Sequence, residues 1–372
     1  ATAGSGTISS YQWLLGGSPI SGATAATYTT NVTGSYTVLI TNSNSCTITS
    51  SPAIVITSTG AALAAGTYNI PGTGCGGFDK ISSAVNYINT YGVAGAVIFN
   101  IAPGYAETAP AGGFAITATG TAANTITFQR NGAGAHPVIT AGLQVAGNNN
   151  DAVIKIIGGD YFTIKDITIQ ENPGNIVTAT GATNTMTEWG IALLYATSGN
   201  GPNNNTILND SISLNKAYPN SFGIYSNMRH GAATPATVLD LASASGGQNK
   251  VYGNAISNVN MPICFIGANS IANMSAGNDI GGSSATTANS ITNWGSNTVN
   301  SGTGSFAGVS ATMAGIYVTN QINLNISWNS INSATGVNVG AAGFRGVFAD
   351  FTWNAAGGNF TNAITNNTIL LN

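Results

Sequence analysis

The second half of the chain repeats a short phrase in which apolar residues alternate with small or polar residues on either side of an Asn or Asp. A recurrence of this kind is typical of repeat architectures, in which each unit buries its apolar face only by stacking on the next. Asp166, Asp210 and Asn254 are 44 residues apart. That spacing fits two coils of about 22 residues or one coil with long loops. The phrase occurs at residues 161–169, 205–214, 249–257, 323–331 and 360–369.

A second phrase, in which an apolar residue follows a small one, interleaves with the first at residues 189–193, 222–225, 261–265, 314–317 and 344–348. The two phrases predict strands on different faces of each coil. Asn tolerates left-handed backbone, and its amide can bond to the same group one coil above and below. We therefore expect an internal Asn ladder, with Asp166 in one of its slots. We expect these residues to form the core: Ile164, Ile167, Ile169, Ile207, Ile212, Val251, Ile256, Ile326, Ile331, Ile364 and Ile369.

One helix is predicted, where Phe78, Ile81, Val85 and Ile88 fall at helical spacing. Asp79 would lie in its first turn, and Gly92 would end it. The buried-strand pattern of residues 96–101 follows. A helix in this place would cover the open apolar end of a stack of coils.

Residues 1–58 differ from the rest, because short strand-like stretches alternate there with turn residues, as in a β-sandwich. Residues 59–77 form a connector rich in Gly, Ala and Thr, and residues 78–372 are expected to form the helix-capped stack. The expected strands of the first region lie around residues 11–13, 26–29, 34–40 and 53–57, with a turn at residues 16–19.

Charged residues make up only 5% of the chain, and the net charge is −3. An ordinary soluble domain has roughly 25% charged residues. The sequence has no basic patch that would bind nucleic acid and no polybasic stretch that would bind an anionic membrane. It has no apolar run long enough for a transmembrane helix. Hydrophobic residues at 43%, many in period-two patterns, argue against disorder.

Three cysteines, Cys46, Cys75 and Cys264, cannot all pair within one chain. Whether Cys46 and Cys75 pair with each other or elsewhere is open at this point. No cysteine pair has metal-ligand spacing, and His136 and His230 are the only histidines, so no metal or cofactor is expected. The chain starts without a Met or a leader and stops within a strand-like phrase. We interpret it as a piece of a longer protein.

The first region resembles the immunoglobulin-like modules of large secreted proteins of the Bacteroidetes. The resemblance rests on Trp13 as a core residue, residues 20–24, residues 34–38 as a tyrosine-corner strand, and Cys46 in the last hairpin. It implies that the partner of Cys46 lies on an early strand that would precede Ala1. The module would then be truncated at its N-terminus.

The region from about residue 68 onward resembles the right-handed parallel β-helix, or pectate-lyase-like, regions of secreted Bacteroidetes surface proteins. This resemblance rests on the predicted helix followed by residues 92–100, and on residues 124–132, 137–140, 159–167, 188–190 and 223–225. The expected fold is all-β: a right-handed parallel β-helix with an N-terminal capping helix, after a partial immunoglobulin-like β-sandwich. The resemblance also implies type IX secretion and a place outside the cell or on its surface.

Catalytic chemistry is sparse, because the eleven acids are scattered and no two are adjacent or one apart. A lyase of this fold class needs clustered carboxylates that hold Ca²⁺, and a hydrolase needs two carboxylates across a cleft. One weak group remains: Asp160, Asp166 and Glu171, with Lys155 and Lys165 nearby. We interpret Asp160 as a turn residue and Asp166 as part of the ladder; a calcium or carbohydrate site is the alternative.

Other candidates are weaker. Residues 229–231 read Arg-His-Gly but lack the paired aspartates of a polygalacturonase-type site, and Asp210-Ser211-Ile212 matches a short O-glycosylation sequence of the Bacteroidetes. Aromatic residues could stack on sugars if they were exposed, although at strand spacing they are more often core residues. They are Trp189, Trp294, Trp328, Trp353, Tyr195, Tyr225, Tyr252 and Tyr317.

The sequence therefore predicts a structural and adhesive stalk segment of a secreted or cell-surface bacterial protein, not an enzyme. Glycans, other copies of the chain and further modules of the same polypeptide are the expected partners, without nucleic acid or membrane insertion. A polysaccharide lyase or glycoside hydrolase is the alternative; it would bring carboxylates and a basic group together on one strand face, where a stalk would show Asn, Thr and Ser. Ice binding ranks last, because the Thr residues hold no fixed register.

Overall fold

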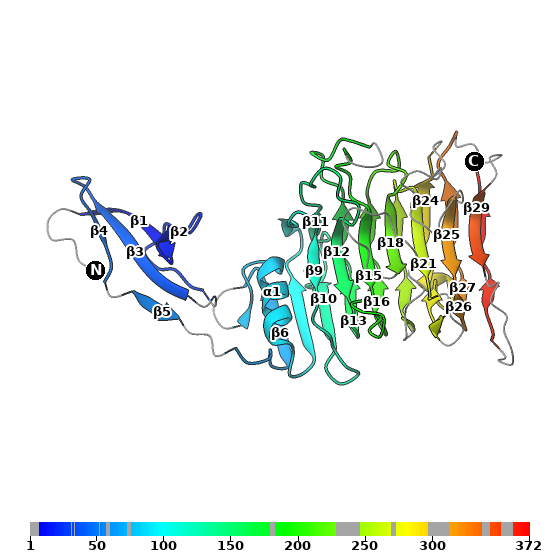
Figure 1. Ribbon diagram of the computed structural model, residues 1–372, viewed down its shortest axis with the longest axis horizontal. Helices are drawn as coiled ribbons and strands as arrows, with labels where there is room; N and C mark the ends of the chain where they lie inside the picture. Colours follow the sequence, from blue (N-terminus) through cyan, green and yellow to red (C-terminus); the bar gives the residue numbers. More distant parts are fainter. Residues whose placement is uncertain are drawn as a thin grey trace. The chain divides into compact units, whose positions relative to one another are not determined.

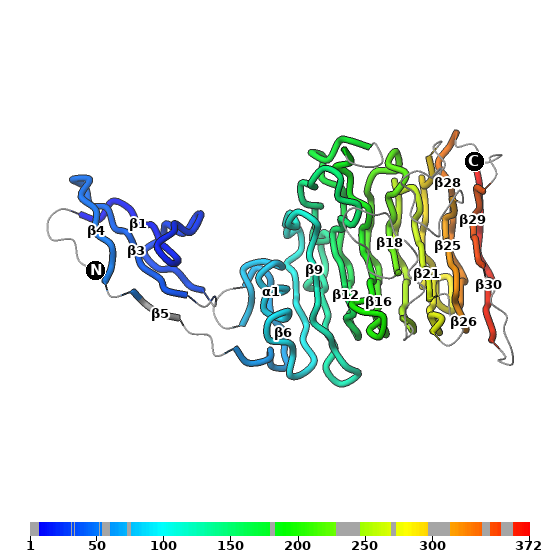
Figure 2. Tube along the Cα trace, in the orientation of Figure 1, coloured from blue at the N-terminus to red at the C-terminus, as the bar shows by residue number. Residues whose placement is uncertain are grey.

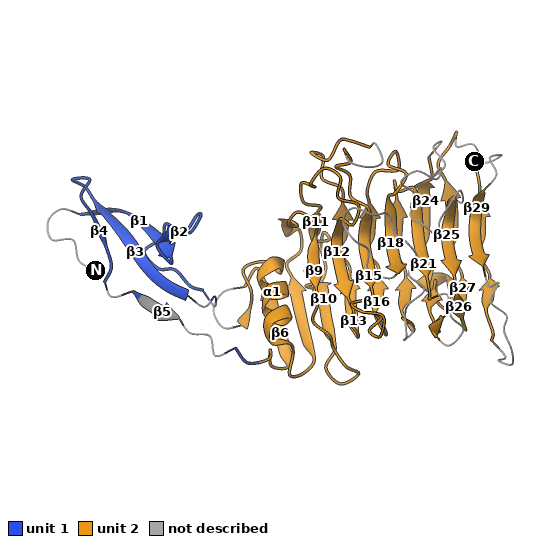
Figure 3. Cartoon of the chain, viewed as in Figure 1, with its two compact units in different colours: residues 1–61 blue, residues 62–372 orange. Residues whose placement is uncertain are grey.

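The computed structural model describes residues 7–30, 32, 34–51, 53–56, 60–72, 76–178, 183–227, 246–268, 273–296, 313–336, 343–350 and 360–372. The chain divides into two compact units, residues 1–61 and 62–372 (Figure 3). The described structure is almost entirely β, with long parallel sheets in the larger unit.

The smaller unit contains one antiparallel sheet in its described part, with the order β2-β1-β3-β4 and with β5 also paired to β3. A Gly16-Gly17 turn with positive φ at both residues joins the first two strands, as a tight hairpin requires. Residues 26–29 form no strand, but the Tyr28 ring lies 5.9 Å from that of Trp13. The strands are β1 (Ile8–Leu15), β2 (Ser18–Pro19), β3 (Gly34–Asn42), β4 (Thr47–Thr49) and β5 (Ile54–Ile56).

In the larger unit, the chain passes in turn through three parallel sheets and then returns to the first (Figures 1 and 2). We call one such passage a coil. Asn205 and Asn249, 44 residues apart, occupy the same place on successive coils. The 44-residue spacing in the sequence therefore corresponds to one coil with long loops. This arrangement is compatible with a parallel β-helix.

The nine-stranded sheet consists of β6 (Gly66–Ile70), β7 (Val97–Ile101), β10 (Ile126–Arg130), β13 (Phe162–Lys165), β16 (Thr206–Leu208), β19 (Lys250–Tyr252), β23 (Asp279–Ile280), β27 (Asn325–Ser327) and β30 (Ala363–Thr365). Strand β6 lies within the expected connector of residues 59–77.

The eight-stranded sheet consists of β8 (Ala106–Thr108), β11 (Val138–Thr140), β14 (Thr168–Gln170), β17 (Ser211–Ser213), β20 (Ala255–Ser257), β24 (Ser290–Trp294), β28 (Ser330–Ser333) and β31 (Thr368–Leu370). The first sequence phrase therefore spans two short strands and the sharp corner between the nine-stranded and eight-stranded sheets.

The seven-stranded sheet contains the second phrase, as expected for a different face of each coil. It consists of β9 (Phe114–Ile116), β12 (Ala152–Ile157), β15 (Trp189–Leu194), β18 (Phe222–Asn227), β21 (Met261–Ile266), β25 (Met313–Thr319) and β29 (Phe344–Asp350). A small parallel pair, β22 (Ser275–Ala276) and β26 (Gln321–Ile322), and a 3-10 turn, η3 (Ala285–Thr287), complete the described elements.

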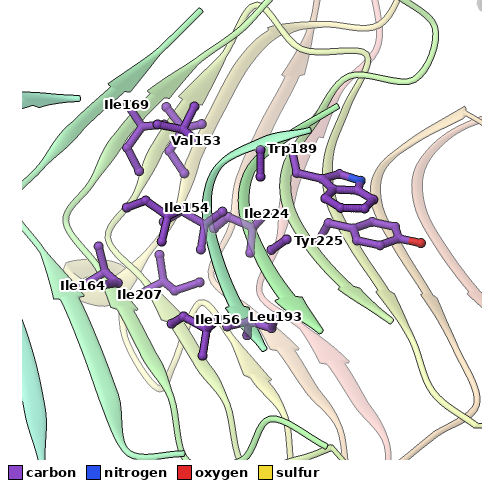
Figure 4. Packing of buried hydrophobic residues seen from close by; sticks show 14 of the residues in the cluster. Val153, Ile154, Ile156, Ile164, Ile169, Trp189, Leu193, Ile207, Ile224 and Tyr225 are labelled. Atoms are coloured by element: carbon purple, nitrogen blue, oxygen red, sulfur yellow. The ribbon is translucent and has the colours of Figure 1, made fainter. Parts of the chain in front are cut away.

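Rows of aliphatic side chains fill the space between the sheets. Ile164 pairs with Ile207, Ile169 with Ile212, and the rows continue through later coils (Figure 4). The expected core residues are buried except Ile364 and Ile369, which are 45% and 46% exposed. They lie on β30 and β31, the last strands of their sheets, and no described strand covers them.

Glycines in the second phrase bring two sheets close together. A Cβ on Gly223 would lie 2.6 Å from Cγ2 of Ile256, and a Cβ on Gly190 would lie 2.7 Å from Cγ2 of Ile212. Gly346 faces Ile369 in the same way. The missing side chain thus makes room for an Ile of the eight-stranded sheet in coil after coil.

Helix α1 (Ile81–Tyr91) forms where the sequence predicts it and buries Ile81, Ala84, Val85 and Ile88. Asp79 precedes the helix, so its expected place in the first turn is wrong. Glu107 supplies the negative charge instead, because its carboxylate accepts hydrogen bonds from the N–H groups of Ile81 and Ser82 at 2.7 and 3.1 Å. Such a charge stabilises a helix N-terminus. This contact, from a strand that follows the helix, could not be read from local sequence.

The predicted Asn ladder is present and is in fact two ladders. The first, which we call the Asn205 ladder, lies where the chain enters the nine-stranded sheet. There the N–H of Asn205 donates to Oδ1 of Asn249 at 3.0 Å, and the N–H of Asn249 donates to Oδ1 of Asn278 at 2.9 Å. Leu324 interrupts this series, and its N–H donates to Oδ1 of Asn362.

The second ladder, which we call the Asp210 ladder, lies at the corner between the nine-stranded and eight-stranded sheets. Its members are Asp210, Asn254, Asn289, Asn329 and Asn367. Asp166 is not a member, contrary to our expectation. It lies one position earlier, with φ 57°, where the backbone turns the corner, and Ile167 occupies the slot on that coil.

Candidate functional site

The structure does not bring the sequence-predicted acids into one site. The Asp160 carboxylate accepts a hydrogen bond from the N–H of Asn203 at 2.7 Å, whereas Asp166 forms an ion pair with Lys165 at 3.7 Å. Glu171 follows β14, and its carboxylate accepts hydrogen bonds from Thr187, in the loop before β15. The three acids are separated because short strands place them at different corners of one coil.

A buried acidic cluster that the sequence did not reveal lies at the corner before the seven-stranded sheet. Glu188 and Asp151 are both 0% exposed and stand in register on adjacent coils. The Glu188 carboxylate accepts hydrogen bonds from the Tyr218 hydroxyl at 2.5 Å, from Nδ2 of Asn184 at 2.7 Å and from the N–H of Asp151 at 3.0 Å. Burial raises the pKa of Glu188 well above its ordinary value.

Asp151 completes this cluster. Its Oδ1 accepts a hydrogen bond from Asn148, and Lys155 lies on β12, the strand that Asp151 directly precedes. Burial raises the pKa of Asp151 to about 7, although Lys155 and Asn148 oppose the shift. Nearby, Glu171 accepts bonds from the Thr187 hydroxyl at 2.7 Å and from Nδ2 of Asn175 at 2.8 Å.

These contacts indicate a structural role for the acids. Neither Asp151 nor Glu188 reaches the surface, so a substrate would have no access to either carboxyl group. The sequence contains one signal for this pair: Asp151 and Glu188 occupy the same place in two successive coils, directly before a strand of the seven-stranded sheet. In the parts of the chain that the structure describes, no group of three or more His, Cys, Asp or Glu side chains is arranged to hold a metal ion.

The candidate aromatic platform is largely interior. Trp189, Trp294, Tyr195, Tyr225 and Tyr317 are buried, as their strand spacing suggested. The Trp189 ring stacks on that of Tyr225 at 4.9 Å (Figure 4).

The remaining aromatic candidates offer less. Trp328 and Tyr252 are half-exposed, and the Tyr252 hydroxyl donates to Asp279 at 2.5 Å. Trp353 and the sequence of residues 229–231 lie outside the described residues. No aromatic platform is therefore evident among the described residues.

The cysteines and the short glycosylation sequence have simple surroundings. Cys46 is an exposed free thiol, Cys264 is a buried one, and Cys75 lies outside the described residues. Ser211 is half-exposed on β17, whereas Asp210 beside it is only 1% exposed. Glycosylation of Ser211 stays a prediction.

The outward face of the eight-stranded sheet is rich in short hydroxyl side chains. Its side chains carry no charge in the described strands, and most are short hydroxyl residues. Register aligns them, since Ser213 pairs with Ser257 and Ser257 with Thr292. Thr and Ser together form partial rows, which Val138, Gln170, Ala255 and Asn332 interrupt. We call this surface the hydroxyl face: Thr108, Thr140, Thr168, Ser211, Ser213, Ser257, Ser290, Thr292, Ser330 and Thr368.

No family model matches the chain, and no curated protein matches it. The only α-helix among the described residues, α1, is too short to cross a membrane.

Proposed function

We propose that the chain is a structural and adhesive stalk segment of a secreted or cell-surface bacterial protein. In this proposal the larger unit is a right-handed parallel β-helix that α1 caps, and the smaller unit is an immunoglobulin-like module. The Bacteroidetes origin and the type IX route belong to the same proposal, and they rest on sequence resemblance alone.

The hydroxyl face is the observation that carries the stalk proposal. A carbohydrate-active enzyme of this fold class needs carboxylates and a basic group on one accessible strand face. The eight-stranded sheet presents Ser and Thr instead, and the acids in register, Asp151 and Glu188, are sealed inside. A depolymerisation assay with the whole chain on a panel of polysaccharides tests this point, and turnover of any of them would refute it.

Two features of the units support their assignment. The four helix residues that α1 buries pack into the core of the larger unit. In the smaller unit, the Tyr36 hydroxyl donates to the backbone carbonyl of Val32 at 2.8 Å, four residues upstream. A tyrosine corner of an immunoglobulin-like sandwich makes a bond of this kind.

Adhesion is proposed to use the hydroxyl face, with glycans or a second copy of the chain as the partner. A neutral surface of short donors and acceptors suits a neutral, hydroxyl-rich ligand. Glycan-array binding and sedimentation should be compared for the parent, Ser213→Lys and Ser257→Lys. Both variants should lose binding or self-association. Thr163→Lys, on the outward face of β13, is the matched control. Equal binding by all four proteins would contradict the use of this face.

The register of the hydroxyl face favours ice binding as a second candidate. Strands about 4.8 Å apart repeat hydroxyl groups along part of the sheet, as at Ser213, Ser257 and Thr292, and a regular spacing of this kind suits a crystal of water. Thermal hysteresis of the parent chain, lost in Ser213→Lys, would support this candidate. Its absence at high protein concentration would remove it.

A further inference from the structure

Asp210 is the one acid in a ladder that asparagines otherwise build. In each of the other members, Nδ2 donates a hydrogen bond to a backbone carbonyl on the preceding coil. The pairs are Asn254 with Ile207 at 3.0 Å, Asn289 with Val251 at 2.8 Å, Asn329 with Ile280 at 3.0 Å and Asn367 with Ile326 at 2.8 Å. Each position of the Asp210 ladder therefore calls for a hydrogen-bond donor at the atom that is Nδ2 in asparagine.

Asp210 matches the asparagines at its other oxygen. Its Oδ1 accepts a hydrogen bond from the N–H of Ile167 at 2.8 Å, just as Oδ1 of Asn254 accepts from the N–H of Asp210 at 2.9 Å. Its Oδ2 is buried and has no hydrogen-bond partner. Register assigns the carbonyl of Ile164 to this oxygen, because Ile164 pairs with Ile207 as Ile207 pairs with Val251.

The surroundings do not favour a carboxylate at this place. Asp210 is 1% exposed, and the like charge of Asp166 acts on it. Lys165 is engaged with Asp166, and on β19 of the next coil Lys250 is exposed while Tyr252 bonds to Asp279. Burial, with Asp166 adding to it, raises the pKa of Asp210 well above its ordinary value, although the backbone groups of Ile167 and Leu208 oppose the shift.

We propose that Asp210 is a neutral carboxylic acid at neutral pH and that its Oδ2–H donates to the carbonyl oxygen of Ile164. The ladder then contains one pH-sensitive link. As the pH rises past the pKa of the folded state, the proton passes to water. Two acceptor oxygens then face each other, and this link of the stack opens.

Linkage fixes the sign of the effect. The folded state holds a proton that the unfolded state releases above about pH 4, so rising pH favours unfolding. Each pH unit between that value and the pKa of the folded state lowers the folding equilibrium constant about tenfold. An amide in the same slot carries no such proton.

The test compares the parent with Asp210→Asn and with the control Asp79→Asn, by chemical unfolding from pH 4 to pH 9. Asp79 is exposed and precedes α1. Asp210→Asn should become progressively more stable than the parent as the pH rises, while Asp79→Asn should keep the pH dependence of the parent. Contributions from Asp151 and Glu188 are common to all three proteins and cancel in the comparison.

A spectroscopic measurement addresses the proton itself. The infrared difference between parent and Asp210→Asn at pH 7 should contain the carbonyl band of a protonated carboxylic acid. A carboxylate band in its place would overturn the proposal. So would parallel pH profiles for parent and Asp210→Asn, or failure of Asp210→Asn to fold, since the slot is built for an amide.

Discussion

Replacement of Asn254 by Ala tests the Asp210 ladder at its centre. Asn254 is 0% exposed, and its side chain joins three coils. Its Oδ1 accepts from the N–H of Asp210 at 2.9 Å, and its Nδ2 donates to the carbonyl of Ile207 and to Oδ1 of Asn289, both at 3.0 Å. Alanine removes all three bonds and leaves the N–H of Asp210 buried without its acceptor.

The magnitude follows from these groups. A buried polar group that loses its partner costs about 1–3 kcal/mol, and each further lost bond adds about 1 kcal/mol. We therefore expect Asn254→Ala to lower the free energy of unfolding by about 3–5 kcal/mol. Asn86→Ala is the matched control, because Asn86 is exposed on α1 and the same substitution should change stability by less than about 0.5 kcal/mol.

Chemical unfolding measures the loss, and amide hydrogen exchange locates it. The N–H of Asp210 should exchange much faster in Asn254→Ala, while amides of α1 should keep their protection. If Asn254→Ala and Asn86→Ala unfold at the same denaturant concentration, the ladder amides do not hold the coils together and the reasoning is wrong.

Three further predictions concern the packing and the buried acids. Gly223→Ala should destabilise the protein by about 1–3 kcal/mol, because its Cβ would meet a backbone carbonyl of β21 at 2.6 Å; Gly76→Ala, with open space around it, should be near neutral in the same thermal melt. Ile212→Ala should cost about 2–5 kcal/mol and Ile369→Ala clearly less, because the first is fully buried and the second is 46% exposed; equal losses would contradict the described end of the stack. Since burial raises the pKa of Asp151 to about 7, the folded state keeps a proton that the unfolded state releases, and stability should fall from about pH 4 to pH 7. Asp151→Asn should flatten that part of the profile, and an unchanged slope would count against it.

Much of the fold was predictable because the repeat sets the register. Period-two aliphatic residues such as Ile207 and Ile212 identified the core, and the spacing of Ile81, Val85 and Ile88 identified the helix. Ile364 and Ile369 were predicted as core but are half-exposed, because burial depends on a neighbouring coil and not on the residue's own phrase.

The contacts between coils were much harder to predict. Asp166 and Asp210 looked equivalent in the sequence, yet one turns the corner and the other occupies the slot, a difference of one position. Glu107 caps a helix that lies 26 residues earlier in the chain. Glu188 and Asp151 meet only because two loops of different length return to the same register. Pairings of this kind need the three-dimensional alignment of coils, which local pattern does not supply.

The tight corners and the variable loops together determine how this chain can change in length. Equivalent ladder positions are separated by 44 residues between Asp210 and Asn254 but by 35 between Asn254 and Asn289. The connecting segments therefore absorb insertions and deletions while the pitch of the stack stays constant. A protein built in this way can acquire new surface decorations, or gain and lose whole turns, without redesign of its interior.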